Sequence, residues 1–258
     1  MEKGKCVPIK GLSNIRRLPR LGVIKLGMKN ERNLPVALDY FLCPGEVREV
    51  YNEKPRALDI RFALENSDDI FPQFYKLYGS SAGLKAYSDG VKLWTKGNEP
   101  GEWNESPAPT KEELIKAGFK ATGTLSFVLP KVSYAGIYQV TTRSFHSIVK
   151  LNSSIDYIRQ LFGRVQGLPL KLELESQEAY IQINGKPAKK TVWTMKLNFD
   201  MEEVKAFWAG KQKALGEMKA PTAMLQTETE SMSEVDEDED EDEDEELGEG
   251  IHRSDLPA

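Results

Sequence analysis

The chain has 258 residues, 40% of them hydrophobic, and a formal net charge of −5, values typical of one large or two small globular domains. No apolar run approaches the roughly 18 to 20 residues that a membrane span requires, and the first residues lack the apolar core of a signal peptide. The two cysteines, Cys6 and Cys43, are too few for a disulfide framework, so the sequence predicts a reduced, cytoplasmic protein without a membrane partner.

The modest net charge hides two parts of opposite sign. Residues 219–258 contain 16 acidic and 2 basic residues, so the remaining 218 residues carry a net charge of +9. Residues 236–246 are eleven consecutive carboxylates, and such a block repels itself and cannot bury apolar surface. We therefore predict one folded domain over residues 1–217 and a disordered acidic tail over residues 218–258.

The N-terminal segment is strongly basic. Residues 1–29 contain eight Lys or Arg and one Glu. Basic arms often contact nucleic acid, which makes four residues candidate contacts with DNA or another polyanion: Lys10, Arg16, Arg17 and Arg20. The alternative is an ordinary folded strand, which the alternation of Ile24, Leu26 and Met28 with other residues favours.

Residues 38–62 predict a strand, a Pro-Gly turn, a short helix and a second strand. Pro44 is suited to the start of the helix, because the first turn tolerates a missing donor. The segment from Phe71 to Tyr78 then contains four aromatic residues. Aromatic rings beside Lys76 can stack on bases, but they are more often core or partner contacts. We take three of them as candidate contacts with a partner protein: Phe74, Tyr75 and Tyr78.

Residues 96–111 are rich in Pro, Gly, Asn and Ser and predict a loop. Thr110 and Glu113 have the spacing of a capping box for a helix that begins at Lys111. The apolar segment that follows predicts a strand that ends at Pro130.

The stretch from Ile137 to Leu174 predicts a strand, a bent helix and a strand. Ser144 is a suitable N-cap, with Phe145, Ile148 and Val149 on the apolar face of the first half. Ser153 and Ser154 predict a second cap, after which Ile155, Ile158, Leu161 and Phe162 continue the apolar face. Gly163 predicts a left-handed stop, and Leu170, Leu172 and Leu174 alternate with charged residues as in a half-buried strand.

The last predicted elements are a hairpin and a helix. Asn184-Gly185 is a hairpin signal, although the nearby Pro187 predicts a loop longer than two residues. Trp193, Met195, Leu197 and Phe199 share one face of the returning strand, and Asp200 and Glu203 predict a cap for a helix over residues 201–215. The whole pattern predicts an α+β fold with a mixed, mainly antiparallel sheet and several short helices, followed by the disordered acidic tail.

No motif of an enzyme is present. The sequence has no phosphate-binding loop, no dinucleotide-binding glycine pattern, no GxSxG and no HExxH. The two histidines are His146, which is placed as a capping or core residue, and His252, which lies in the acidic tail. We therefore predict a protein that is not an enzyme and has no cofactor.

Several blocks together resemble the phage recombination directionality factor-like family. They include YFLCPGEVREVYNEKPRALDI, FPQFYKLYGSSAGLK, TGTLSFVLPKVSYAGIYQVTTRSFHSIVKLNSSIDYIRQL and GLPLKLEL, in the family's order over roughly residues 8 to 210. The resemblance implies an accessory protein in the cytoplasm of a bacterial host. Such a protein binds a large serine integrase, redirects its coiled-coil segments and switches it from integration to excision, without chemistry of its own.

The resemblance also bears on metals. Many members of the family have several cysteines in the region that corresponds to residues 85–123, as if they bound a metal, but this chain has none there. We therefore predict no metal. Two other classes stay open: a single-strand DNA-binding or phage replication accessory protein, which the basic body and aromatic residues favour, and a phage enzyme or metal protein.

Deletion of residues 219–258 tests the use of the two charges. A tethered polyacidic segment has an effective concentration on the order of millimolar, so it competes with any polyanion for the basic residues of the body. We expect the truncated chain to bind DNA non-specifically with higher affinity at low salt, and the difference to shrink as salt rises. Electrophoretic mobility shifts across a salt series measure this, and equal affinities at every salt concentration would rule out self-masking.

Overall fold

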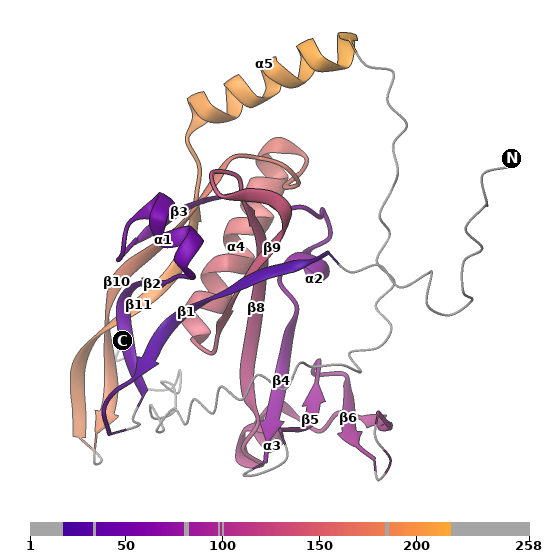
Figure 1. Cartoon of the computed structure of the whole chain (residues 1–258). Helices are drawn as coiled ribbons and strands as arrows, with labels where there is room; N and C mark the ends of the chain where they lie inside the picture. The colour runs from indigo at the N-terminus through magenta and orange to yellow at the C-terminus, as the bar shows by residue number, and fades with distance from the viewer. Residues whose placement is uncertain are drawn as a thin grey trace, which may run out of the picture.

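The computed structural model describes residues 18–32, 35–79, 83–97, 99, 101–183 and 186–217. The predicted DNA contacts Lys10, Arg16 and Arg17, the predicted acidic tail and the Asn184-Gly185 turn lie outside these residues. Within them the fold is α+β with a mainly antiparallel mixed sheet, which confirms the predicted class (Figure 1).

The described residues form eleven strands and five helices, more than the sequence pattern indicates. The strands are β1 (Arg20–Lys29), β2 (Pro35–Leu42), β3 (Ala57–Ile60), β4 (Gln73–Tyr78), β5 (Leu84–Ser88), β6 (Lys92–Lys96), β7 (Trp103–Pro107), β8 (Lys120–Leu129), β9 (Ser133–Thr142), β10 (Leu170–Ile183) and β11 (Lys186–Asn198). The helices are α1 (Gly45–Tyr51), α2 (Ser67–Ile70), α3 (Lys111–Lys116), α4 (Phe145–Phe162) and α5 (Met201–Glu217). Searched over the described residues, none of these helices has the length and apolar character to cross a membrane.

The strands form two sheets. The larger has the order β2-β1-β9-β8-β4-β5-β6-β7, in which β1 and β9 are parallel and all other neighbours are antiparallel. The smaller has the order β11-β10-β3, and Arg61 just after β3 exchanges two backbone hydrogen bonds with Val128 of β8, at 3.0 and 2.8 Å. This bridge holds the small sheet against the large one, and the main core lies between them.

Two sequence predictions about strands are wrong. Part of the predicted loop over residues 96–111 is strand β7, in which Trp103 pairs with Lys96 and Glu105 pairs with Trp94. Pro107 ends this edge strand, where a missing donor is tolerated. The hairpin of β10 and β11 pairs Ile183 with Lys186, so two residues separate the paired ends, not more. Pro187 is accepted because β11 is an edge strand.

Helix α4 is continuous through Ser153 and Ser154, so the predicted bend is wrong. Its ends are as predicted: the Ser144 hydroxyl accepts the Ser147 N–H at 3.3 Å, and Gly163 ends the helix with a φ of 70°. A single buried stripe explains the continuity, because Ser147, Leu151, Ile155 and Ile158 reach the core only if the helix is unbroken.

Of the apolar face predicted for the first half of α4, Ile148 packs against the main core, but the other two residues are exposed. Phe145 is 63% exposed and Val149 is 44% exposed, because both lie on the side opposite the buried stripe. Helical spacing alone allowed either side to be the core face. The true core side carries a serine, Ser147, which a search for apolar residues does not select.

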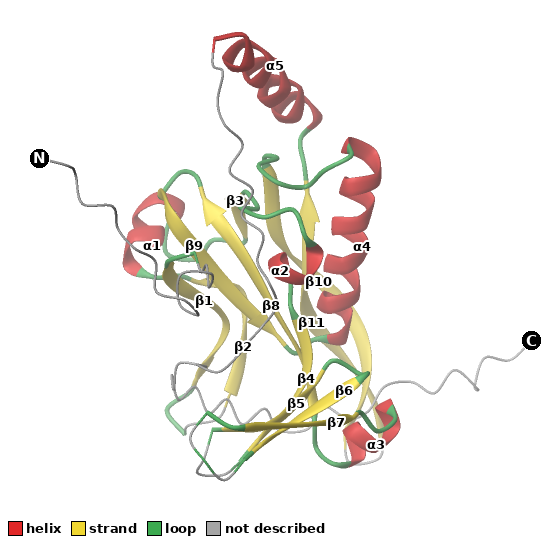
Figure 2. Cartoon of the chain, turned by 90° about the vertical axis from the view of Figure 1, so that its right-hand side faces the viewer, coloured by secondary structure: helices red, strands yellow, loops and turns green. Residues whose placement is uncertain are grey.

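Polar contacts fix α4 against the small sheet. The buried Ser147 hydroxyl accepts the backbone N–H of Met195 at 3.1 Å. One turn on, the Lys150 ammonium donates to Glu175 Oε2 and to Thr194 Oγ1, both at 3.0 Å. These contacts set the register of the helix along the β10–β11 hairpin, with the outer side of α4 turned away from both sheets (Figure 2).

Ser147→Ala tests this attachment. The substitution leaves the Met195 N–H buried without an acceptor, which costs about 1 to 3 kcal/mol of unfolding free energy. Chemical denaturation of the variant measures the loss. Ser153→Ala, on the exposed side of the same helix, is the matched control and is expected to change stability by less than about 0.5 kcal/mol. Equal effects in the two variants would contradict the assigned role of Ser147.

Candidate functional site

Strand β4 has one covered and one open face. Gln73, Tyr75 and Leu77 lie on the covered face, where the Gln73 and Asn152 side-chain amides exchange hydrogen bonds of 2.7 and 3.0 Å with each other. Tyr75 and Leu77 pack on a small core of Ala86, Leu114 and Phe119 beneath α3. The structure therefore places Tyr75, a predicted partner contact, against this small core.

The open face carries the other two predicted contacts. Successive side chains of a strand alternate between faces, and directly paired residues share a face. The register therefore brings to one side a set of aromatic and cationic residues from β4, β5, β6, β7 and β8, which we call the open face: Phe74, Lys76, Tyr78, Tyr87, Lys92, Trp94, Lys96, Trp103, Glu105 and Lys120. Helices α3 and α4 lie on the opposite side of these strands, and no described helix covers the open face (Figure 2).

Aromatic rings form the middle of the open face. The Tyr87 ring stacks on the Trp94 ring with centroids 4.9 Å apart, and it meets the Trp103 and Phe74 rings edge-on at 5.0 and 5.6 Å. Tyr87 is only 8% exposed because these three rings surround it. Phe74, Trp94 and Trp103 are half-buried, so each keeps part of its surface accessible.

Cations surround the rings. Lys76 pairs directly with Lys120 across β4 and β8, and the guanidinium of Arg143 lies 5.9 Å from the centroid of the Tyr78 ring. Lys92 and Lys96 lie on β6, where Lys92 Nζ is 2.8 Å from Glu105 Oε1. With Arg143, the open face thus carries five cations and one carboxylate, and like charges directly opposite each other destabilise a sheet.

Burial and the positive charge of Arg143 lower the pKa of Lys76 below the ordinary lysine value. Burial also raises the pKa of Tyr78, which is 48% exposed, and the charge of Arg143 acts in the opposite direction. Burial and the neighbouring guanidinium therefore disfavour the charged form of Lys76 in the folded chain. A negatively charged group beside Lys76 would favour that form.

The predicted basic contacts are only partly described. Arg20 begins β1, and its paired residue on β9 is Ile137. It is exposed, and it lies at the opposite end of the strand order from the β5–β7 part of the open face. The structure therefore does not bring Arg20 together with the cations of the open face.

Sequence reasoning missed most of the open face. It selects Phe74 and Tyr78, but not Trp103, which lies in the loop predicted over residues 96–111, nor Trp94, for which it predicts no element. Only the pairing of β6 with β7 shows that Trp94, Lys96 and Trp103 share a side. The alternation of Lys92, Trp94 and Lys96 with other residues is the signal that could have found this strand.

The outer side of α4 is an apolar surface of different character. Four apolar side chains are exposed along it, and we call them the α4 stripe: Phe145 (63%), Val149 (44%), Tyr157 (58%) and Leu161 (46%). They recur at spacings of four or eight residues, so at about 100° per residue the stripe winds around α4, and Phe145 and Tyr157 point about 120° apart. The stripe is therefore a curved apolar surface along α4.

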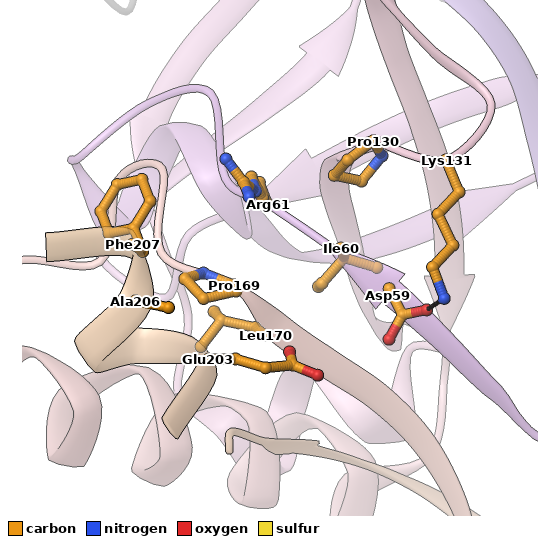
Figure 3. A pocket seen from close by; sticks show the side chains of 10 residues that line it. All are labelled: Asp59, Ile60, Arg61, Pro130, Lys131, Pro169, Leu170, Glu203, Ala206 and Phe207. Atoms are coloured by element: carbon orange, nitrogen blue, oxygen red, sulfur yellow. Dashed lines mark ion pairs between the residues drawn. The ribbon is translucent and has the colours of Figure 1, made fainter. Parts of the chain in front are cut away.

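A cavity of about 420 Å³ lies between β3, the start of β10 and α5 (Figure 3). Its acidic groups are paired: Asp59 Oδ2 lies 2.5 Å from Lys131 Nζ, and Glu203 Oε1 lies 3.6 Å from Lys171 Nζ. The Arg61 guanidinium lies 5.4 Å from the centroid of the Phe207 ring. The contacts of Glu203 and Phe207 fasten α5 to the body. The lining includes two acidic residues, Asp59 and Glu203, and two basic residues, Arg61 and Lys131, so the cavity favours neither cations nor anions.

The described residues offer little for catalysis or metal binding. No group of three or more His, Cys, Asp or Glu side chains that could hold a metal occurs among them. Cys43 is buried in the main core, and burial raises the pKa of its thiol to about 12. His146 is exposed at the start of α4, not in the core.

Comparison with known proteins gives one match. A family model described as recombination directionality factor-like matches residues 21–201. No curated protein and no solved structure matches the chain. The matched range includes every strand from β2 to β11, the open face and the α4 stripe.

Lys76→Met tests the cost of the cationic cluster. Because the pKa of Lys76 is lower in the folded than in the unfolded chain, the unfolded chain binds more protons, and stability rises with pH between the two pKa values. We expect the variant to be more stable than the wild type at pH 7 by a few tenths to about 1 kcal/mol. We also expect the variant to lack the increase in stability with rising pH that Lys76 causes in the wild type.

Denaturation at several pH values measures both effects. Lys96→Met, on the same face but paired with Trp103 instead of a cation, is the matched control. If Lys76→Met were less stable than the wild type at pH 7, the assigned repulsion would be wrong.

Proposed function

This chain belongs to the recombination directionality factor-like family, and on that premise we propose that it binds a large serine integrase and switches it from integration to excision. In this role the integrase breaks and joins DNA, and the chain acts as its accessory in the cytoplasm of the bacterial host. The match over residues 21–201 is the observation that carries the proposal. We further propose that residues 1–217 act as one domain and residues 218–258 as its acidic tail.

We propose the α4 stripe as the surface that meets the integrase. The centres of protein interfaces are depleted of charge and enriched in aromatic residues, and a few such residues supply most of the binding free energy. Phe145 and Tyr157 are the two most exposed aromatic residues of α4 and have the character of such anchors. The open face fits this description less well, because its rings are half-buried and its rim is cationic.

The sequence-based interface remains a prediction. Phe74 and Tyr78 lie on the open face, and Tyr78 is 48% exposed. Arg143, over the Tyr78 ring, lies two residues before Phe145. The integrase-binding assay on variants of Tyr78 and of the α4 stripe distinguishes the two surfaces.

The direct test combines the purified chain with the integrase encoded in the same genome. We expect the chain to make the integrase recombine the two sites that flank an integrated phage, and to suppress joining of the phage and host sites. Substrates that report each direction measure the product ratio. An unchanged ratio at saturating concentrations of the chain would contradict the proposed function.

The double substitution Phe145→Ala and Tyr157→Ala tests the interface. Loss of two aromatic anchors is expected to cost at least about 2 kcal/mol, or about thirtyfold in integrase affinity. Tyr134→Ala removes a tyrosine that is 65% exposed elsewhere, on β9, and is the matched control. If the double variant keeps wild-type affinity for the integrase and Tyr78→Ala loses affinity, the interface lies on β4 and not on α4.

A further inference from the structure

We propose that the open face binds a single-stranded nucleic acid, with cations at the phosphates and aromatic rings against the bases. The inference is independent of the proposed function, because it concerns the opposite side of the strands from the α4 stripe. Three features of the open face support it: the sign of its charge, the placement of its rings and the absence of a covering element in the described part of the chain.

The charge of the open face favours a polyanion. Lys76 and Lys120 are direct cross-strand partners, and the charge of Arg143 acts on Lys76. Lys96 extends the positive charge to β6, where it pairs with Trp103 of β7. A phosphate chain that crosses the sheet meets these cations in turn and relieves their repulsion. Release of its counterions then contributes to affinity.

The rings favour unpaired bases. Aromatic side chains that stand on a sheet surface stack on the bases of single strands, whereas a duplex hides its base faces. Phe74, Trp94 and Trp103 stand together around Tyr87, with centroids 4.9 to 5.6 Å from its ring, and each is half-buried. Tyr87 thus holds the other three rings in place from below. This arrangement leaves three accessible rings interspersed with the cations of β4 and β6.

The dimensions of the open face suit a short strand. Neighbouring strands are about 4.8 Å apart, so the path from β8 through β4, β5 and β6 to β7 is about 19 Å long. Sites for single strands on sheet surfaces range from about 4 nucleotides upward. The open face is therefore long enough for a site at the small end of this range.

An acidic peptide is the other polyanion to consider. It would satisfy the cations but not the three accessible rings, which present flat surfaces suited to bases. A protein partner with apolar anchors has the more exposed α4 stripe on the other side of the strands. The open face therefore favours nucleic acid, and a peptide becomes one outcome of the test.

The test measures binding of the full chain to three fluorescent probes by anisotropy at low and moderate salt: a 20-nucleotide oligo(dT), a 20-nucleotide oligo(U) and a 20-base-pair duplex. We expect the single strands to bind more tightly than the duplex. The two single-strand probes distinguish DNA from RNA. Trp103→Ala is expected to weaken binding about tenfold, the loss of one stacked base.

Charge variants test the phosphate contacts. Lys96→Gln and Lys120→Gln are expected to weaken binding several-fold each and to reduce the dependence of affinity on salt. Lys205→Gln, on the exposed side of α5, and Tyr134→Ala are the controls and are expected to bind as the wild type. Thermal unfolding confirms that each variant is folded.

Three outcomes would overturn the proposal. One is the absence of single-strand binding at low salt. The second is equal loss in the control and open-face variants. The third is tighter binding of an acidic peptide, such as a 20-residue poly-glutamate, than of oligo(dT). The integrase assay is run on the same variants, so failure here with normal integrase binding leaves the proposed function standing.

Discussion

One constraint determines the rest of this structure: within the described residues, apolar elements cover only one face of the eight-stranded sheet. That cover is α4 together with the small sheet, joined by the buried contact of Ser147 with Met195 and the Lys150 contacts with Glu175 and Thr194. The covered side supplies Leu125, Phe127 and Val140 to the main core, whereas Thr124 and Thr141, on the opposite side of the same strands, exchange a 3.3 Å hydrogen bond. The second face of such a sheet must be exposed to solvent or covered by a partner.

Two surfaces of different chemistry follow from this constraint. Because α4 turns its buried stripe to the sheets, its other side exposes Phe145 and Tyr157. Because α3 covers only one side of β4–β7, the other side exposes cations and half-buried rings. An accessory protein of a recombinase works on a complex that contains both protein and DNA. Separate surfaces for protein and for nucleic acid are consistent with such a role and allow both contacts at once.

The sequence correctly predicted the features that depend on residues close together in the chain. The capping box of Thr110 and Glu113, the N-cap at Ser144 and the left-handed stop at Gly163 are all present, because each depends on residues a few positions apart. Leu170, Leu172 and Leu174 are buried as their alternation indicates. The family itself was also evident, since its sequence blocks are long and ordered.

The sequence predictions that failed concern features that depend on pairing between residues far apart in the chain. The side of α4 that is buried is decided by β11, some 45 residues later, and the helical spacing of Phe145 and Val149 fits either side. Strand β7 exists because β6 pairs with it, although its own composition favours a loop. Tyr75 and Tyr78 are three residues apart and so lie on opposite faces of one strand, a difference that composition cannot reveal.

Hydrogen–deuterium exchange of the full chain, alone and with the integrase, tests most directly the claim that the two sides of the molecule serve different partners. The account predicts that the integrase slows exchange in residues 145–161 and leaves residues 92–107 unchanged, and that oligo(dT) does the reverse. Protection of residues 92–107 by the integrase, with none along α4, would contradict it.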